Sequence, residues 1–145
     1  NWIHMEAKEE NLDLVFSLEN QDQMIIFIVD PNLSCDARLV YTNREFEPKD
    51  FDDMSGETFD WKLSGQFYKD ENASRLNADG YVRWELMSFY KHHFSKLEEL
   101  LSKRGQISFS INDPLNRFEK QEIEIKANGL SSALNSALDT CQGWT

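Results

Sequence analysis

Cysteine, proline and glycine are all scarce in this chain of 145 residues, which contains two, three and six of them respectively. Two cysteines allow at most one intramolecular disulfide, and six scattered glycines form no glycine-rich loop. The longest apolar run, residues 24–29, is also far shorter than the roughly 18 residues that a membrane-spanning helix requires. An ordinary globular domain without a transmembrane segment is therefore expected.

Positive charge is scarce as well. The chain has 15 lysines and arginines against 26 acidic residues, which gives a net charge of -11. Proteins that bind nucleic acids draw their affinity from clustered lysines and arginines, so we expect no nucleic-acid partner. The excess of carboxylates permits a basic protein partner, although it can equally serve only to keep the surface soluble.

Familiar catalytic and cofactor motifs are absent from the sequence. No serine lies in a Gly-x-Ser-x-Gly motif, and no glycine-rich loop is present to bind phosphate. His92 and His93 are adjacent, which places them about 100° apart on a helix, whereas two metal ligands on one helix face need a spacing of four. We therefore predict a protein that is not an enzyme, with no catalytic residues, no metal site and no cofactor. An unfamiliar enzyme would need a cleft with convergent polar groups around His92 or His93.

Alternating polar and apolar residues predict a sheet-rich fold. Residues 11–18 alternate and residues 24–29 are almost continuously apolar, which is typical of a hairpin whose second strand is central and covered on both sides. Residues 106–111 and 122–126 predict another antiparallel pair. Shorter strands are predicted at residues 38–42, at residues 58–64 with an extension through 67–68, and at residues 81–86. The polar residues between 69 and 80 are expected to form an exposed, mobile stretch.

Two segments change to helical spacing. The first predicts a helix at about residues 88–104, ended by Gly105, and the second predicts a C-terminal helix at about residues 130–141. The length of the chain suits a single domain, residues 1–145. Grouped antiparallel strands with few helices predict an α+β fold, a mostly antiparallel β-sheet or sandwich with the helices packed on one side or end.

The two cysteines, Cys35 and Cys141, can form only one intramolecular bond. We predict this disulfide because one cysteine lies just past a strand and the other lies near the C-terminal end, which needs fastening. The alternative is a pair of reduced, buried cysteines in a cytosolic protein. A disulfide predicts a periplasmic or otherwise exported protein, and the start at Asn1 in place of methionine predicts a leader that was removed or left out.

Residues 44–60 are the most acidic part of the chain, and aromatic residues are interleaved with the acids. One interpretation is a solvated connection whose phenylalanines pack into the core. The other is a recognition surface, because exposed aromatics surrounded by one sign of charge combine an anchor with electrostatic steering. The residues predicted to bind a partner are Glu45, Glu47, Asp50, Phe51, Asp52, Asp53 and Glu57.

The end of the chain resembles a known group of bacterial proteins. The strand around Phe109, the segment 126–130, the pair Ala133 and Leu134, and a final Cys141 followed by Trp144 are similar to accessory proteins of the type VI secretion apparatus. The resemblance covers about the last third of the chain, without the cysteine-rich N-terminal segment of that family. It implies a periplasmic, non-enzymatic protein that works by contact.

These features favour a periplasmic binding module, such as a secretion-system accessory or a toxin-neutralising immunity protein, that meets its partner through an acidic surface containing aromatics. A second hypothesis is a domain that holds a small apolar molecule or a lipid between sheet and helix. Its aromatic residues would be Trp61, Trp84, Phe89 and Phe94, for which ordinary core packing is the simpler role.

Overall fold

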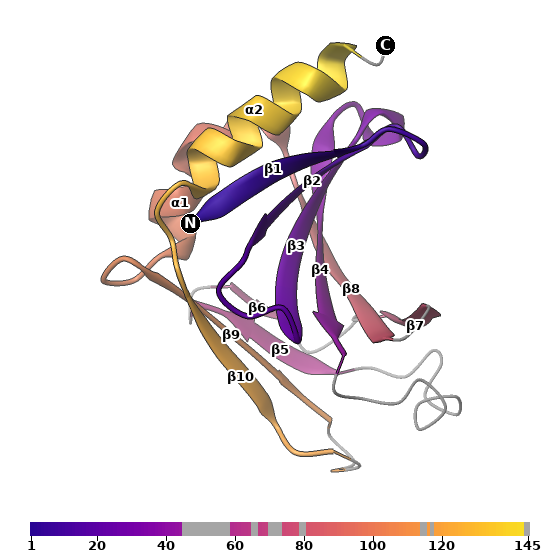
Figure 1. Ribbon diagram of the computed structural model, residues 1–145. Helices are drawn as coiled ribbons and strands as arrows, with labels where there is room; N and C mark the ends of the chain where they lie inside the picture. The colour runs from indigo at the N-terminus through magenta and orange to yellow at the C-terminus, as the bar shows by residue number, and fades with distance from the viewer. Residues whose placement is uncertain are drawn as a thin grey trace.

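The computed structural model describes residues 1–44, 59–64, 67–69, 74–78, 81–113, 116 and 118–143. In these residues the strands form two antiparallel sheets, and the helices lie together on one side (Figure 1). The fold is α+β, as the sequence predicts. The N-terminus lies beside the start of the C-terminal helix, and the C-terminus lies at the far end of that helix (Figure 1).

The larger sheet, here called the large sheet, has six strands in the order β1-β2-β3-β4-β8-β7. Their bounds are β1 Trp2–Ala7, β2 Leu12–Ser17, β3 Gln23–Asp30, β4 Asp36–Asn43, β7 Ser74–Ala78 and β8 Tyr81–Phe89. The predicted hairpin is confirmed, because β2 and β3 pair in antiparallel register with Phe16 opposite Ile26. Two strands were not predicted: β1, and β7, which lies in the stretch expected to be mobile. Each is an edge strand that pairs with one neighbour.

The smaller sheet, here called the small sheet, has four strands in the order β10-β9-β5-β6. Their bounds are β5 Asp60–Leu63, β6 Phe67–Lys69, β9 Gln106–Asn112 and β10 Gln121–Lys126. The predicted pair near the end of the chain is confirmed as β9 and β10, with Phe109 opposite Ile123. The strand expected to run through residues 67–68 instead ends at Leu63, and β6 folds back antiparallel to β5.

Both predicted helices are present. The first is α1 Phe94–Leu101, preceded by the 3-10 turn η3 Lys91–His93, and it is shorter than expected because β8 continues to Phe89. The second is α2 Leu130–Gly143, which begins just after Gly129 at φ +90°. Glycine is favoured at this position because other residues rarely adopt such a positive φ. Helix α2 packs along β1, β2 and β3 and against α1 (Figure 1).

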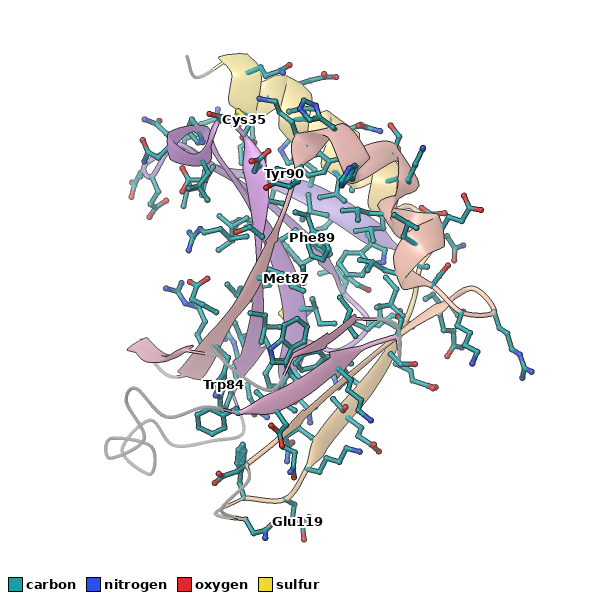
Figure 2. The ribbon with its side chains drawn as sticks, turned by 180° about the vertical axis from the view of Figure 1, so that it is seen from behind. Cys35, Trp84, Met87, Phe89, Tyr90 and Glu119 are labelled. Atoms are coloured by element: carbon teal, nitrogen blue, oxygen red, sulfur yellow. A yellow bond between two sulfur atoms is a disulfide. The ribbon has the colours of Figure 1, made fainter. Side chains whose placement is uncertain are left out.

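One core lies between the two sheets and under the helices. Aromatic rings join the layers: Tyr41 of the large sheet lies 4.8 Å from Phe109 of the small sheet, measured between ring centroids. Trp84 stacks on Tyr41 with centroids 5.5 Å apart. Figure 2 shows Trp84, in the first half of β8, towards the small sheet, and Phe89, the last residue of β8, towards the helices. The core is therefore continuous from α2 to the small sheet.

The helices cover only one face of the large sheet, here called its inner face. On β2 the side chains buried on this face are Asp13, Val15 and Ser17, whereas the leucines and Phe16 that alternate with them are only partly buried. On β3 Met24 and Ile26 are likewise half-buried. The expectation that β3 is covered on both sides is therefore wrong for its first half. The half-buried apolar residues point to the opposite face, here called the outer face.

Candidate interaction surface on the outer face of the large sheet

The seven acidic and aromatic residues predicted to bind a partner lie outside the described residues. They are Glu45, Glu47, Asp50, Phe51, Asp52, Asp53 and Glu57. In the sequence they follow Arg44, whose backbone N–H donates to the carbonyl of Asp22 at 2.8 Å. The described surface next to Arg44 is therefore the part of the structure nearest in sequence to these residues.

The disulfide is present. Cys35 and Cys141 are bonded with their Cα atoms 5.9 Å apart, and both are buried. Cys35 directly precedes β4, and it lies under the last turn of α2 (Figure 2). The bond therefore holds the end of α2 on the inner face and leaves the outer face untouched.

The outer face carries a continuous apolar area across three strands. The strand register places Met5 of β1 opposite Leu14 of β2, and Phe16 of β2 opposite Ile26 of β3. Because side chains directly opposite each other share a face, these residues form neighbouring rows of one surface. Sequence alternation alone identified this apolar row on β2, but it did not indicate that the core would use the other face.

A groove is formed on this area, and we call it the outer groove. It encloses about 380 Å³ and is lined mainly by apolar side chains: Met5, Leu14, Phe16, Leu18, Gln21, Met24, Ile26, Thr42 and Arg44. Two of these are well exposed, Met5 at 46% and Leu18 at 51%. Exposed apolar residues are unremarkable singly, whereas a contiguous group rimmed by polar residues is typical of an interaction site.

Beyond the outer groove the same face becomes charged. Val40 of β4 lies opposite Ile26 on one side and Glu85 of β8 on the other, which places Glu85 in the row of the groove residues. Arg38 donates to Glu85 at 2.9 Å, and the guanidinium of Arg83 lies 3.6 Å from the same carboxylate oxygen. These three side chains are only about a quarter exposed. The outer face thus has an apolar half over β1 to β3 and a paired, charged half over β4 and β8.

Exposed carboxylates lie on the turns beyond the two ends of the outer groove. The turn between β1 and β2 carries Glu9 and Glu10, and two residue pairs of the strands separate this turn from the pair of Met5 and Leu14. The turn between β2 and β3 carries Glu19 and Asp22. The carboxylate of Glu19 accepts a hydrogen bond from the backbone N–H of Lys126 on β10 at 2.8 Å, and the cationic Arg44 lines the groove at this end. In the first turn Lys8 offsets part of this charge. The two turns therefore carry more acidic than basic side chains, although none of these four carboxylates lines the groove itself.

A second group of polar side chains lies on the inner face, between β1 and α2. His4 Nε2 lies 2.6 Å from Asp13 Oδ1, and His4 Nδ1 lies 2.9 Å from the hydroxyl of Ser136 on α2. Asp13 is fully buried and Ser136 is exposed. The three residues form a hydrogen-bonded chain that joins the N-terminal edge strand to the C-terminal helix. Sequence reasoning missed it, because the residues are 9 and 132 positions apart.

Replacing His4 by alanine is expected to lower the free energy of unfolding by about 1 to 3 kcal/mol, because it removes a hydrogen-bond partner from the buried carboxylate of Asp13. Urea denaturation followed by circular dichroism measures the change. His92 is exposed, and its replacement by alanine is the matched control, with an expected change below about 0.5 kcal/mol. Equal effects of the two substitutions would show that the chain through His4 adds no stability.

The remaining residues considered from the sequence are not brought together into a site. His92 and His93 are both exposed, and His93 has a ring contact with Tyr90. The four aromatics proposed to hold a lipid are at most 6% exposed and belong to the packed core.

In the part of the chain that the structure describes, no group of three His, Cys, Asp or Glu side chains is placed to hold a metal ion. None of the described helices is both long and apolar enough to cross a membrane.

The chain was also compared with known proteins. No protein-family model, curated protein or solved structure matches it. Among the described residues, the outer groove is the feature that best supports a binding function.

Proposed function

We propose that this protein is a non-enzymatic binding module of the bacterial periplasm that acts by contacting a basic protein partner. A secretion-system accessory and a toxin-neutralising immunity protein both act in this way. The observation that carries the proposal is the outer groove, an exposed apolar area on the face of the large sheet that the helices leave open. An exported location is supported by the disulfide, because such bonds persist in oxidising compartments.

Charge supports the proposed basicity of the partner. The chain has a net charge of -11, and the two turns beyond the ends of the outer groove carry more acidic than basic side chains. The acidic residues predicted to bind the partner follow Arg44, which lines the groove. In this proposal the apolar side chains supply most of the binding energy, and the carboxylates speed association and select the partner.

Photo-crosslinking in the native cell tests the proposal. A benzophenone amino acid placed at position 18, on the rim of the outer groove, is expected to form a covalent adduct with one protein whose basic residues outnumber its acidic ones. The same amino acid at position 100 is the control, since Leu18 and Leu100 are similarly exposed, at 51% and 43%, and Leu100 lies on α1. Adducts of equal yield and identity from both positions, or none from position 18, would contradict the proposal.

Replacing Asp50, Asp52 and Asp53 together by asparagine is expected to weaken binding of the crosslinked partner by about tenfold at low salt. Because the contribution is electrostatic, the loss should shrink as the salt concentration rises from about 50 mM towards 500 mM, where such charges are screened. Titration calorimetry across this range provides the measurement. Binding that changes neither with salt nor with the substitutions would show that these residues do not belong to the interface.

A second candidate function, acyl transfer, is favoured by one observation, the chain from Ser136 through His4 to Asp13. A serine bonded to a histidine that a buried carboxylate orients is the arrangement of nucleophilic hydrolases. It ranks second because Ser136 lies inside α2, where backbone N–H groups donate within the helix and are not available to stabilise an oxyanion. If a fluorophosphonate labels Ser136, and if this labelling is lost in the His4→Ala variant, acyl transfer would become the favoured function in place of partner binding.

A further inference from the structure

Strand β10 stands at one edge of the small sheet, and its outer edge pairs with no other strand of the described residues (Figure 1). At Lys126 the backbone groups on this edge bond to side chains from outside the small sheet. The N–H of Lys126 donates to the carboxylate of Glu19 at 2.8 Å, and the carbonyl of Lys126 accepts from the indole N–H of Trp2 at 2.8 Å. Lys126 therefore directs both of its backbone groups away from β9.

Two more residues of β10 direct their backbone groups to the same edge. In an antiparallel pair, residues alternate between those that bond to the neighbouring strand and those that point away from it. Because Lys126 points away from β9, Glu124 and Glu122 do so as well. The register agrees, since Ser108 lies opposite Glu124 and its carbonyl accepts from the backbone N–H of Ser64, on the side of β5. The N–H and C=O groups of Glu122 and Glu124 are therefore open to a further strand.

The side chains along this open stretch differ in what they still require. Glu122 and Glu124 are exposed, and Ile123 between them is half-buried and packs against the core. Lys120 lies 3.1 Å from the carboxylate of Glu122. The carboxylate of Glu124 has a hydrogen bond to the hydroxyl of Ser108 at 3.4 Å but no ion pair among the described residues. An added strand would thus meet one carboxylate without a cation, one partly covered apolar side chain and one carboxylate that already has a lysine.

These differences specify the residues of an added strand. Opposite charges directly across a strand pair are favourable, so lysine or arginine suits the position opposite Glu124. An apolar side chain opposite Ile123 would cover its exposed part, and a β-branched polar residue such as threonine suits the position opposite Glu122. Lys62 and Lys120 line the same face of the sheet, so the preference for a basic residue is confined to the position opposite Glu124.

A second copy of this chain does not match this pattern. A two-fold antiparallel pair built on the two open residues places glutamate opposite glutamate, and like charges directly opposite each other are destabilising. Pairing cannot be moved towards Lys126, because the backbone groups of that residue are already bonded to Glu19 and Trp2. The edge is therefore suited to a different protein.

We propose that the edge of β10 binds an extended segment of another protein, which joins the small sheet as an antiparallel strand and places a lysine or arginine opposite Glu124. Recognition by strand addition draws its affinity from main-chain hydrogen bonds and its specificity from alternate side chains. The inference goes beyond the proposed function, because it concerns the other sheet and does not depend on the outer groove.

Amide hydrogen exchange of the full chain, followed by NMR, provides the first arm of the test. In the free protein the N–H groups of Glu122 and Glu124 should exchange about tenfold or more faster than those of Ile123 and Ile125, which point to β9. The probe is a peptide with valine at alternate positions and with lysine, then threonine, between the valines. Its addition should slow exchange at Glu122 and Glu124 in a saturable way.

Two methylated forms of the peptide make the test specific for strand addition. Methylation of the backbone nitrogens of the lysine and the threonine removes the two N–H groups that donate to β10, so binding should weaken about tenfold or more. Methylation of two valine nitrogens is the matched control, because these N–H groups point away from β10 in the proposed register. It should leave binding within about twofold of the unmodified peptide.

Variants of the chain test the position of the basic residue. Glu124→Lys should weaken binding about tenfold, and a peptide with glutamate in place of its lysine should recover binding to this variant. Glu99→Lys is the control for added positive charge, because Glu99 is exposed on α1, and it should leave binding unchanged.

Three results would overturn the inference: no binding of the unmodified peptide, equal weakening by the two methylation patterns, or slow exchange at Glu122 and Glu124 in the dilute free chain. Slow exchange that appears only as the concentration of the chain rises, without peptide, would show that a second copy occupies the edge and would also overturn it. If the peptide does not bind while position 18 still crosslinks to a basic protein, strand addition is wrong and the proposed function stands.

Discussion

Replacing Cys35 and Cys141 together by alanine is expected to lower the free energy of unfolding by about 4 to 5 kcal/mol, because the bond closes a loop of about a hundred residues in the unfolded chain. The two cysteines are separated by 106 positions in the sequence. For a domain of this size the loss corresponds to a fall of roughly 10 to 20 °C in melting temperature. Melting followed by circular dichroism, with and without dithiothreitol, measures it.

The double variant also provides its own control. Its melting temperature should not respond to dithiothreitol, whereas that of the wild-type protein should fall towards the value of the variant. Because the bond fastens α2 to the turn before β4, the largest local change is expected at the end of the helix, around Cys141. An unchanged melting temperature of the double variant would contradict the disulfide as a main source of stability.

Replacing Trp84 by alanine is expected to cost about 3 to 5 kcal/mol, as for other large aromatic side chains removed from a core. Trp84 is fully buried, stacks on Tyr41 of the large sheet and meets Phe59, the residue before β5 of the small sheet, at 5.9 Å. Its removal would therefore leave a cavity where the two sheets join. Urea denaturation measures the effect.

The control for this substitution is Tyr90→Ala. Tyr90 is 65% exposed and follows directly after β8, so its replacement should change the free energy of unfolding by less than about 0.5 kcal/mol. A cost below about 1 kcal/mol for Trp84→Ala would mean that the sheets are not joined through this ring.

Local patterns in the sequence predicted most of the elements but not how they pack. Strict alternation located β2 and the pair of β9 and β10, and helical spacing with a preceding glycine located α2. Alternation does not tell which face of a strand is buried, however. On β2 it separates two faces without showing which of them α2 covers. The inner face takes the less apolar row of β2, in which the buried Asp13 is hydrogen-bonded to His4.

The edge strands show a second limit of sequence patterns. In β1, Trp2 and His4 face α2 while Ile3 and Met5 face outwards, so apolar residues stand on both sides and no alternation is visible. Strand β7 has an ordinary polar sequence and owes its structure to pairing with β8. The outer groove combines residues from β1 to β4, and it became recognisable only when the register and the helix-free face were known.

The affinity of the crosslinked partner for two matched variants, Leu18→Asp and Leu100→Asp, tests the central claim most directly. Both leucines are exposed, so neither change should unfold the protein, and circular dichroism checks this. If the outer face of the large sheet is the binding surface, Leu18→Asp should weaken binding at least tenfold, or about 1.4 kcal/mol, while Leu100→Asp leaves it unchanged. Unaltered affinity of Leu18→Asp, or an equal loss in both variants, would contradict the account.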